Sequence, residues 1–420
     1  MKVLLTPIGS HGDVHPFVGV GVELARRGHD VTVIANPLYE AMIGRSKLNF
    51  VPLGTAEEFR AAIENPLVWH PVKGFQLLLG FTLQAMRPLY ELIVQHHVPG
   101  QTVVVHSPLG LGGRLAHEKL GVPLVTVHLA PSALRSALCP VVMPHIRLPR
   151  WTPAFVHRLV FWLGDRYVVS PVLDGPLNEF RAELGLHPIA RPLAEWWNSP
   201  QRILGLFPDW FGAPAPDWPA QTRLCGFPMF DERGAAELPA ELEAFLQAGD
   251  APILFTPGSA MQHGQAFFQA AMEACRVLSR RALFLTMYPG QLPANLPATI
   301  RHFSYIPFSQ VFPQAAAVVH HGGIGTTAQG LAAGVPQLIM PMGFDQPDNA
   351  DRLVRLGVGD ALPVRYFTGS KLVGKLHKLL QPEVRRRCAE VASRFASERP
   401  LERICAAIEE VGTAPCAARP

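Results

Sequence analysis

Short apolar runs alternate with helical segments through the first half of the chain. Runs rich in β-branched and apolar residues predict strands, and apolar positions that recur at helical spacing predict helices. The predicted strands are 2–8, 29–35, 102–106, 123–128, 203–207 and 223–226, and the predicted helices include 17–27 and 109–120. Strands that alternate with helices at this spacing predict a doubly wound parallel sheet, so this half is expected to form a Rossmann-like α/β domain.

The second half repeats the same pattern. Its predicted strands are 252–256, 282–287, 301–305, 315–319 and 337–341, and its predicted helices include 240–248, 263–279 and 326–333. A chain of 420 residues is too long for one ordinary core and suits two domains of about 200 residues each. We therefore expect the first domain at 1–226, a polar and turn-rich linker at 227–238, and the second domain at 239–381.

Composition narrows the classes of partner. With 48% hydrophobic and 17% charged residues, the chain is expected to be folded and to have a rather apolar surface. The formal net charge of +4 is small for this length, and no stripe of Lys and Arg alternates with aromatic residues, so no nucleic-acid partner is expected. The one basic cluster, 385–387, is interpreted as a solvated helix face rather than a lipid-binding patch.

The cysteines and the N-terminal residues indicate the cellular compartment in which the protein is expected. The six cysteines are Cys139, Cys225, Cys275, Cys388, Cys405 and Cys416. They form no Cys-x-x-Cys pair and have no zinc-like spacing with histidines, so we expect buried thiols and no metal site. The apolar run after Lys2 is too short for a signal sequence, and no stretch reaches the ~18 uninterrupted apolar residues of a spanning helix. A cytoplasmic location is therefore expected.

A glycine-rich turn in the second half predicts an anion site. The buried strand 315–319 leads into Gly322, Gly323 and Gly325, and a helix follows at 326–333. The unpaired N–H groups of a first helical turn and the helix dipole favour a phosphate there, and glycines let the backbone approach it.

Polar side chains surround this turn. His321 lies at the end of the strand, where it can add a hydrogen-bond donor to the same anion. The next strand, 337–341, leads to Asp345 and Gln346 at the edge where open α/β sheets bind ligands. Side chains suited to hydroxyl groups are thus expected beside a phosphate site.

This stretch resembles the donor-binding signature of GT-B glycosyltransferases that use nucleotide sugars. The family pattern is His-x-Gly-x-x-Ser/Thr-Thr, Gly-Val-Pro and Asp-Gln-x-x-Asn-Ala, and the matching residues are His321, Gly323, Thr326, Thr327, 334–336, Asp345, Gln346, Asn349 and Ala350. The resemblance implies that His321 and the turn 323–327 hold the diphosphate, while Asp345 and Gln346 hold sugar hydroxyls. Plant members carry a Glu for the ribose where this chain has Gln329, so a preference for uridine does not follow.

The turn after the first strand does not match a dinucleotide-binding fingerprint. It has Gly9 and Gly12 rather than Gly-x-Gly-x-x-Gly, and Asn36 stands where an acidic residue is expected. The stretch instead resembles the N-terminal motif of bacterial and sterol-type glycosyltransferases, Gly-Ser-x-Gly-Asp-x-x-Pro followed by Gly-His. The matching residues are Gly9, Ser10, Gly12, Asp13, Pro16, Gly28 and His29.

Asp13 is the candidate catalytic base. Transfer of a sugar to a hydroxyl requires a base within hydrogen-bond reach of the acceptor proton, and a carboxylate at the end of the first strand can supply it. Plant relatives have a His at this position, so the role is carried by position. His11 and His15 are rival bases, Ser10, His11 and His15 are candidates for the acceptor side, and capping of the following helix is the structural alternative for Asp13.

Further residues are assigned by the same resemblance. Ser259, in a turn after the first strand of the second domain, is a candidate phosphate contact, and Tyr305 stands where plant members stack the nucleotide base on Trp. No Asp-x-Asp motif occurs in the second domain, which agrees with metal-independent departure of the diphosphate and with no cofactor beyond the UDP- or dTDP-linked donor. Two long apolar segments, 74–94 and 151–173, suit a hydrophobic acceptor or peripheral contact with a membrane as well as ordinary core packing.

The resemblance covers the whole chain and is strongest to the rhamnosyltransferases of rhamnolipid synthesis and, more distantly, to sterol-type and glycopeptide-antibiotic glucosyltransferases. It implies two Rossmann-like domains facing across a cleft, with helices at 382–420 crossing back to the first, acceptor-binding domain. The expected reaction is inverting, metal-independent transfer of rhamnose or glucose to a hydroxyl of a lipid-like acceptor. A nucleotide-sugar epimerase of the same fold and a non-catalytic nucleotide-sugar-binding subunit remain alternatives, and sequence names neither sugar nor acceptor.

Overall fold

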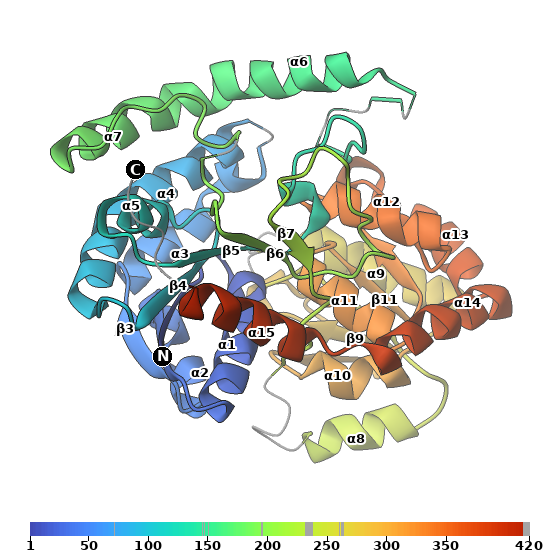
Figure 1. Cartoon of the computed structure of the whole chain (residues 1–420). Coiled ribbons are helices and arrows are strands. Elements are labelled where there is room, and N and C mark those ends of the chain that lie inside the picture. Colours follow the sequence, from blue (N-terminus) through green and yellow to red (C-terminus); the bar gives the residue numbers. More distant parts are fainter. Residues whose placement is uncertain are drawn as a thin grey trace. The chain divides into compact units, whose positions relative to one another are not determined.

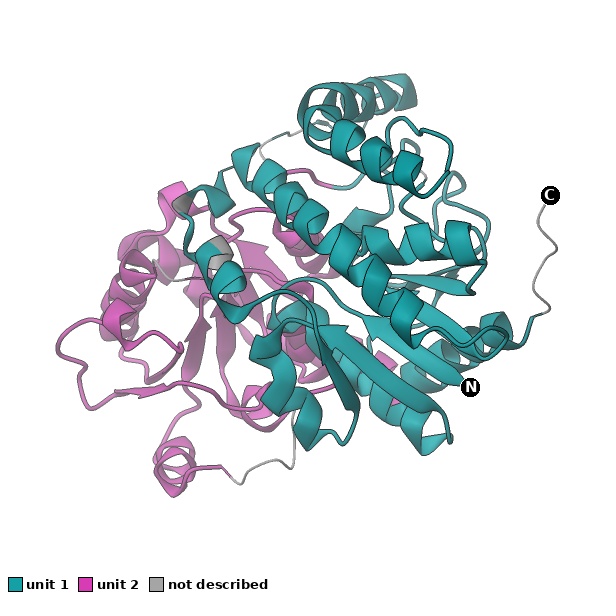
Figure 2. Cartoon of the chain, turned by 90° about the vertical axis from the view of Figure 1, so that its left-hand side faces the viewer, with its two compact units in different colours: residues 1–141, 145–228, 399–420 teal, residues 142–144, 229–398 magenta. Residues whose placement is uncertain are grey.

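The structure is a computed structural model that describes residues 1–70, 72–144, 146, 148–149, 151–194, 196–231, 238–259, 261 and 264–414. The chain divides into two compact units, coloured separately in Figure 2. Unit 1 comprises residues 1–141, 145–228 and 399–420, and unit 2 comprises residues 142–144 and 229–398. Each unit is described by itself.

Unit 1 is built on a parallel sheet in which the described residues form seven strands in the order β3-β2-β1-β4-β5-β6-β7 (Figure 1). The strands are β1 (Lys2–Thr6), β2 (Asp30–Ala35), β3 (Asn49–Pro52), β4 (Thr102–His106), β5 (Leu124–His128), β6 (Arg202–Gly205) and β7 (Thr222–Leu224). The helices are α1 (His11–Arg26), α2 (Glu40–Arg45), α3 (Ala56–Glu64), α4 (Lys73–His96), α5 (Leu111–Leu120), α6 (Ala154–Gly164), α7 (Ser170–Glu183) and α15 (Pro400–Thr413).

Unit 2 has a second parallel sheet, in the order β10-β9-β8-β11-β12-β13 for the residues described. Its strands are β8 (Ile253–Thr256), β9 (Ala282–Leu285), β10 (Ile300–Phe303), β11 (Ala317–His320), β12 (Gln337–Ile339) and β13 (Gly359–Ala361). Its helices are α8 (Ala240–Gln247), α9 (Gln265–Leu278), α10 (Phe308–Val311), α11 (Ile324–Ala332), α12 (Gln346–Leu356), α13 (Gly369–Leu379) and α14 (Pro382–Ala392). The prediction of two Rossmann-like α/β sheets is confirmed.

Short 3₁₀ turns and one π-helical segment join these elements. The 3₁₀ turns are Pro37–Tyr39, Pro66–Trp69, Pro131–Ala133, Pro289–Gln291, Phe312–Gln314, Val364–Tyr366 and Ser393–Ser397. The π-helical segment Asp165–Val169 joins α6 to α7. The predicted helix 151–173 is therefore two α-helices joined through a wider turn, and its second half continues to Glu183.

The largest correction to the predicted elements concerns α1. The sequence predicted a turn at 9–13 and a helix from 17, whereas α1 begins at His11. Ser10 is the N-cap, and the carboxylate of Asp13 accepts a hydrogen bond from the Ser10 backbone N–H at 2.7 Å. This capping contact starts the helix early and places Asp13 in its first turn.

The C-terminal helices divide between the two units. α14 packs against α11 in unit 2, where Gly334 lies close to Cys388 and Ala392. The chain enters unit 1 only at Arg399, so the segment that packs on the first domain begins later than the predicted 382. Much of the predicted linker, residues 232–237, lies outside the described residues, as do Cys416 and the first residue of the predicted helix 263–279.

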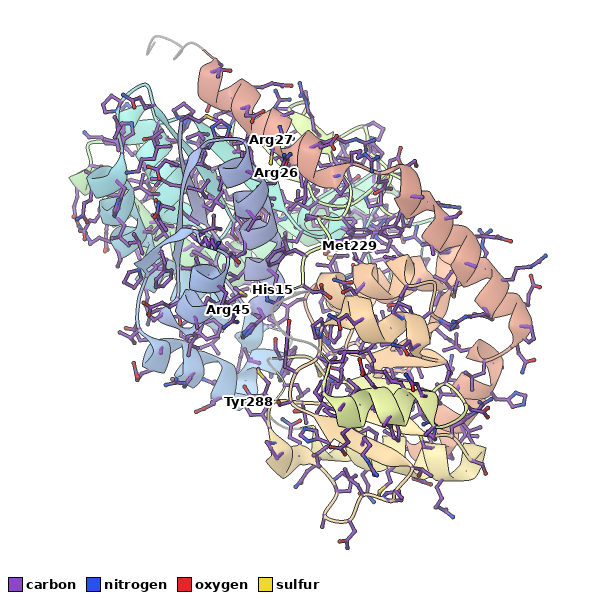
Figure 3. All side chains as sticks on the ribbon, turned by 90° about the horizontal axis from the view of Figure 1, so that it is seen from below. His15, Arg26, Arg27, Arg45, Met229 and Tyr288 are labelled. Atoms are coloured by element: carbon purple, nitrogen blue, oxygen red, sulfur yellow. The ribbon has the colours of Figure 1, made fainter. Side chains whose placement is uncertain are left out.

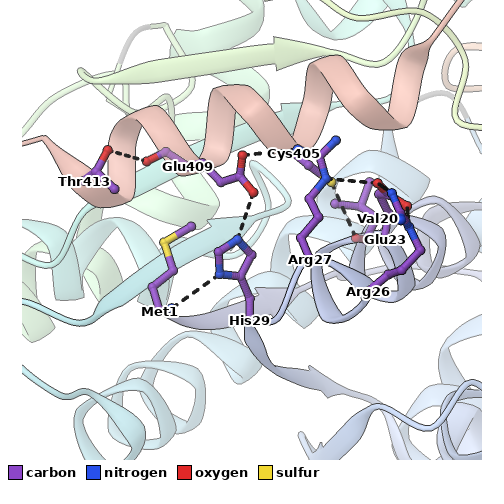
Figure 4. Close-up of polar contacts among 9 residues, drawn as sticks. All are labelled: Met1, Val20, Glu23, Arg26, Arg27, His29, Cys405, Glu409 and Thr413. Carbon is purple, nitrogen blue, oxygen red and sulfur yellow. Dashed lines mark hydrogen bonds and ion pairs between the residues drawn. The ribbon is translucent and has the colours of Figure 1, made fainter.

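Polar and buried contacts hold α15 on unit 1, as Figure 4 shows. His29 Nε2 lies 2.9 Å from a carboxylate oxygen of Glu409, and Arg27 reaches the other oxygen at 3.2 Å. Cys405 is fully buried, with its sulfur 3.9 Å from the Val20 carbonyl oxygen of α1. Figure 3 shows Arg26 and Arg27 where α1 ends, beside the C-terminal helix. The N-terminal and C-terminal segments thus share one packed surface.

The cysteine and arginine predictions have mixed outcomes. Cys225, Cys275, Cys388 and Cys405 are buried thiols, as predicted, but Cys139, in a loop, is exposed. The basic cluster is a solvated helix face, as predicted: all three arginines are exposed on α14. Arg385 and Arg387 also donate to the carbonyl oxygens of Ala315 and Leu356, and Arg386 pairs with Glu383.

The long helix α4 has the length and composition of a membrane-spanning helix, and it is the one helix in the described part of the chain that does. Core helices meet the same criterion. In this structure Leu79, Leu89 and Ile93 of α4 lie in the unit 1 core, where the helix packs against α5 and α7.

Candidate functional site

The candidate residues gather where each sheet reverses its strand order. In an open parallel sheet, ligands bind beyond the carboxyl ends of the strands at this switch point. In unit 1 the switch lies between β1 and β4, and the turn after β1 carries Ser10, His11 and Asp13. In unit 2 it lies between β8 and β11, whose following turns carry Ser259 and His321.

The glycine turn after β11 leaves a helix N-terminus open. Gly322 has φ +98°, in the left-handed region that favours glycine, and a Cβ there would lie 2.6 Å from Ile339. Gly323 is the N-cap of α11, and no side chain among the described residues caps this helix. The first N–H groups of α11 therefore lack a side-chain acceptor, and the helix dipole favours an anion beside them.

The two adjacent histidines have different environments. His320 is fully buried: its Nδ1 accepts from the Gly322 N–H at 3.1 Å, and its Nε2 donates to Gln337 Oε1 at 2.9 Å. Burial lowers the pKa of His320 to about 3, so its ring is neutral and bonds as this assignment requires. His320 therefore shapes the turn, a role that the sequence analysis did not assign.

His321 is packed between two glycines. Its ring atoms would lie 2.6 Å from a Cβ placed on Gly258 or on Gly323, so only glycine fits at these positions. Its Nδ1 is buried and has no hydrogen-bond partner within the described residues. Burial lowers the pKa of His321 to about 4, so a neutral ring stands beside the open end of α11. Such an imidazole can donate one hydrogen bond to an anion.

The remaining residues of the donor turn lie on α11. Gly325 has open space where a Cβ would be, and Thr326 and Gln329 are partly exposed. Thr327 is fully buried, and its Oγ1 has no partner in the part of the chain that is described. The structure thus brings the predicted turn residues together on one short helix, whereas Thr327 faces the interior.

The loop after β12 is fastened to this turn. Asn349 Nδ2 donates to the Gly322 carbonyl oxygen at 2.9 Å and to Asp345 Oδ2 at 2.7 Å. Gln346 Oε1 accepts from the backbone N–H groups of Met342 and Gly343. Asp345 and Gln346 therefore hold their own loop, in addition to any contact with a ligand. Asn349, which belonged to the sequence pattern without an assigned role, is the residue that links loop and turn.

Phe344 marks the same loop as conformationally unusual. Its φ is +54°, although it is neither glycine nor asparagine. A bulky residue in this region costs energy and persists only where its surroundings impose it, most often at functional sites. The strained residue directly precedes Asp345.

Ser259 and Tyr305 lie further from the turn in sequence. Ser259 follows β8, next to Gly258, and its carbonyl oxygen lies 3.5 Å from the Tyr288 hydroxyl. Tyr305 follows β10, the edge strand of the sheet, and is 49% exposed. Both follow carboxyl ends of strands in the same sheet, and Ser259 is the one at the switch point.

The turn after β1 in unit 1 is closed by its own carboxylate. Asp13 Oδ2 accepts from the Ser10 N–H at 2.7 Å and from Ser10 Oγ at 3.0 Å. Gly9 has φ +136°, and a Cβ there would lie 2.2 Å from Asp13 Oδ2. Burial raises the pKa of Asp13 above its ordinary value, although the two Ser10 hydrogen bonds lower it. The carboxylate is thus both a helix cap and a stronger base than an exposed aspartate.

The rival histidines lie on the same helix. The His11 ring contacts Tyr39 edge-on with centroids 5.0 Å apart, and His15 lies 5.9 Å from His11. Figure 3 shows His15 on α1, nearer its N-terminus than Arg26 and Arg27. The Tyr39 hydroxyl donates to the Gly9 carbonyl oxygen at 2.9 Å, which fixes the turn that carries Asp13.

Sequence analysis missed two buried histidines in unit 1. His106 and His128 end β4 and β5, and burial lowers their pKa values to about 3 and about 4. His106 Nε2 lies 2.6 Å from Thr126 Oγ1, and His128 Nε2 lies 2.7 Å from Asn198 Oδ1. Ser107, next to His106, donates its N–H to the Thr6 carbonyl oxygen at 3.2 Å and so lies beside the β1 turn. The sequence did contain a signal for these residues, since each histidine ends a buried apolar strand.

Comparison with known families gives two matches that cover different halves of the chain. Residues 3–139 match the glycosyltransferase family 28 N-terminal domain. Residues 284–411 match the C-terminal domain of erythromycin biosynthesis protein CIII-like proteins.

Curated relatives align along nearly the whole chain. Glycosyltransferase GtfE of Amycolatopsis orientalis is 30% identical over 93% of this chain and 93% of its own length. O-mycaminosyltylonolide 6-deoxyallosyltransferase of Streptomyces fradiae is 29% identical over 98% of this chain and 97% of its own length.

Solved structures share the fold. The glycotransferase of kitacinnamycin superposes with a TM-score of 0.74 at 21% identity, over 98% of both chains. The glycosyltransferase VinC, solved in complex with dTDP, gives a TM-score of 0.66 at 21% identity, over 98% of this chain and 99% of its own.

Proposed function

This chain belongs to the GT-B glycosyltransferases, and on that premise we propose that it transfers a hexose from a UDP- or dTDP-sugar to a hydroxyl of a hydrophobic acceptor, with inversion at the anomeric carbon. Rhamnose and glucose are the sugars proposed. One observation carries the donor half of the proposal: the N-terminus of α11 is uncapped beside a buried His321 Nδ1 that has no partner in the described structure. A diphosphate would satisfy both.

The donor would be held through its diphosphate. Backbone N–H groups at the start of α11 and the His321 ring would donate to phosphate oxygens, and these bonds would strengthen as negative charge builds on the leaving diphosphate. Because His321 is neutral, it acts as a hydrogen-bond donor rather than as a counter-charge. Asp345 and Gln346, on the loop tied to this turn by Asn349, are proposed to contact the sugar hydroxyls.

Asp13 is proposed as the base. Its carboxylate would accept the proton of the acceptor hydroxyl as the hydroxyl oxygen attacks the anomeric carbon from the face opposite the diphosphate. The bond between that carbon and the diphosphate oxygen breaks in the same step, which inverts the configuration. Both hydrogen bonds from Ser10 to the Asp13 carboxylate use Oδ2, so Oδ1 is proposed to accept the proton.

The test is ligand-dependent thermal stability. We expect UDP or dTDP to raise the unfolding midpoint, whereas GDP, ADP and NAD should not; a hundredfold excess over the dissociation constant adds ~2.7 kcal/mol. dTDP is a natural first probe because a structural relative was solved with it. His321→Ala should abolish most of the shift, and His377→Ala, an exposed histidine on α13, is the matched control that should keep it.

Measuring the reaction products then distinguishes a transferase from an epimerase and from a non-catalytic binding subunit. A sugar transferred only when a hydroxylated acceptor is present supports the proposal. Isomerisation of the nucleotide sugar without an acceptor would indicate an epimerase. Nucleotide-sugar binding with no turnover for any hydrophobic hydroxylated acceptor would indicate a binding subunit, and a midpoint shift with NAD alone would refute the donor site itself.

A further inference from the structure

Helix α6 of unit 1 has its apolar side outward. Of its residues Ala154–Gly164, most are apolar, yet the one that is buried is His157. The large side chains along this stretch are exposed instead. Their exposed fractions are Trp151 82%, Phe155 67%, Leu159 51%, Trp162 43%, Leu163 40% and Tyr167 64%. An ordinary amphipathic helix of a folded domain buries these residue types.

These six side chains, named here the α6 apolar face, follow helical spacing. Trp151 lies in the turn before α6, and the positions from 155 to 167 are three or four residues apart except for the adjacent pair at 162 and 163, so these five fall along one side of α6 and the π-helical segment that follows it. At 1.5 Å per residue, the twelve steps from 155 to 167 make a stripe about 18 Å long. Figure 1 shows α6 and α7 following one another along one border of the domain, with α7 over α4.

The opposite side of the helix is anchored, which fixes the direction of this face. Asp165, directly after α6, is fully buried and pairs with Arg135 at 2.7 Å and with Arg191 at 3.2 Å. The Arg135 guanidinium also lies 5.6 Å from the centre of the Phe161 ring. His157 is 2% exposed, and both its ring nitrogens are buried without a partner among described residues. The helix thus turns His157 inward, while Phe155, Leu159, Trp162 and Leu163 face solvent.

The charges around the face have one sign. Arg158 and Arg166 are exposed, and the Arg166 guanidinium lies 5.8 Å from the centre of the Tyr167 ring. The only acidic residue between 151 and 167 is Asp165, which is buried and paired. Aromatic and aliphatic side chains flanked by Arg, without exposed acids, fit the boundary between acyl chains and anionic headgroups.

We propose that the α6 apolar face docks this enzyme on a bilayer that contains anionic lipids. Trp151, Phe155 and Leu159 enter the boundary region, Trp162 and Tyr167 keep their polar edges at headgroup level, and Arg158 and Arg166 meet lipid phosphates. The exposed charged residues between 151 and 167 are both arginines, which complements the phosphates of anionic headgroups. The inference goes beyond the proposed function and requires neither the sugar nor the acceptor to be known.

Vesicle sedimentation of the full chain tests the proposal. We expect the protein to sediment with vesicles of equal parts phosphatidylcholine and phosphatidylglycerol, and much less with phosphatidylcholine alone. Trp151→Ser/Phe155→Ser should lower the partition coefficient about a hundredfold, since each large apolar side chain contributes about tenfold. Arg158→Gln/Arg166→Gln should remove the preference for anionic vesicles and leave the weak binding to phosphatidylcholine.

The matched control is Val364→Ser/Tyr366→Ser in unit 2. These residues are 52% and 49% exposed, and Arg365 lies over the Tyr366 ring, so the pair resembles the α6 face in composition but is isolated. This variant should bind vesicles like the unmodified chain. All variants alter exposed side chains, so their unfolding midpoints and nucleotide shifts should be unchanged, and a chain that lost its fold would be recognised by these measurements.

Three outcomes would overturn the proposal. One is no sedimentation with either vesicle; another is sedimentation that the Trp151→Ser/Phe155→Ser variant does not reduce. The third is a dimer in light scattering that this variant converts to a monomer, without vesicle binding, which would assign the face to a second copy of the chain. Failure of nucleotide binding or transfer would refute the proposed function while leaving vesicle binding intact, so the two failures are distinguishable.

Discussion

The turn after β1 in unit 1 and the turn after β11 in unit 2 share a backbone plan and differ in charge. In each, a glycine with positive φ, Gly9 or Gly322, precedes the N-cap of a helix. The third helical residue is Asp13 in α1 and Thr326 in α11. Because the Asp13 carboxylate accepts from the Ser10 N–H, the first helix end is filled by its own anion, whereas the second is open.

This difference assigns different chemistry to similar turns. A helix N-terminus that already holds a carboxylate repels a phosphate and keeps a base in place, and an uncapped one attracts a phosphate. Both turns require glycine. A Cβ on Gly9 would clash with the Asp13 carboxylate, and a Cβ on Gly322 would clash with Ile339 and distort the turn. One residue at the third helical position therefore separates a candidate base site from a candidate anion site.

Removing the charge from the filled turn should have the largest effect. Asp13→Asn should lower kcat about 100-fold or more, because the amide cannot take the acceptor proton. The amide oxygen can still accept from the Ser10 N–H, so the unfolding midpoint and the nucleotide-induced shift should be retained. Steady-state transfer rates and thermal shifts measure both.

His11→Gln and His15→Gln are the comparison variants for that experiment. Each should reduce kcat far less than Asp13→Asn does. A loss of similar size in either one, with Asp13→Asn nearly active, would move the base role to that histidine and leave Asp13 as a cap only.

Filling the open turn should have the next largest effect. Thr326→Asp gives α11 the residue that α1 has, and a carboxylate there should repel the diphosphate and weaken UDP or dTDP binding at least about tenfold. The same change should raise the stability of the unliganded protein by up to about 1 kcal/mol, because an anion favours a helix N-terminus. Titration calorimetry and thermal unfolding report the two effects.

Thr326→Asn is the neutral control, and it should change nucleotide affinity little. An unchanged affinity in Thr326→Asp would show that the diphosphate does not lie at this helix end. The assignment of the α11 turn as the diphosphate site would then be wrong.

The smallest expected effect is on the pH profile. The base must be ionised, so kcat/KM should fall as pH falls through the Asp13 pKa, which burial raises above that of an ordinary aspartate. The Ser10 hydroxyl donates to Asp13 at 3.0 Å, and this hydrogen bond lowers the pKa of Asp13. Ser10→Ala removes the bond and so raises that pKa, which should move the acid limb of the profile to higher pH. An acid limb that does not move in Ser10→Ala would mean that another group controls it.

The sequence was most informative where structure depends on neighbours along the chain. Alternating strands and helices predicted both sheets. The glycine turn was correctly placed after β11, although α11 begins at Ile324 and so takes in Gly325. The start of α1 was predicted six residues late, because the Ser10 contact with Asp13 outweighs the break that Pro16 suggests. The sequence assigned the anion contact to His321 alone and gave His320 no role, since Gln337, which His320 bonds, lies on the next strand.

The apolar segments show the same limit. The segments 74–94 and 151–173 received the same interpretation from the sequence, yet α4 contributes Leu79, Leu89 and Ile93 to the core while α6 exposes Phe155 and Leu159. Hydrophobic spacing shows that residues share a side of a helix, but not whether that side meets the protein or the solvent.

By itself, then, the sequence determined the order of the elements, the two glycine turns and the residue types at the strand ends, because strand and helix periodicity and turn chemistry act over a few residues. The tertiary structure alone decided which histidine keeps an unpartnered nitrogen, which helix end is filled, and which way α6 faces. It also decided that α15 packs on α1, where Cys405 meets Val20. Each of these depends on residues distant in the chain, whose packing and burial fix hydrogen bonds and pKa values that no local pattern records.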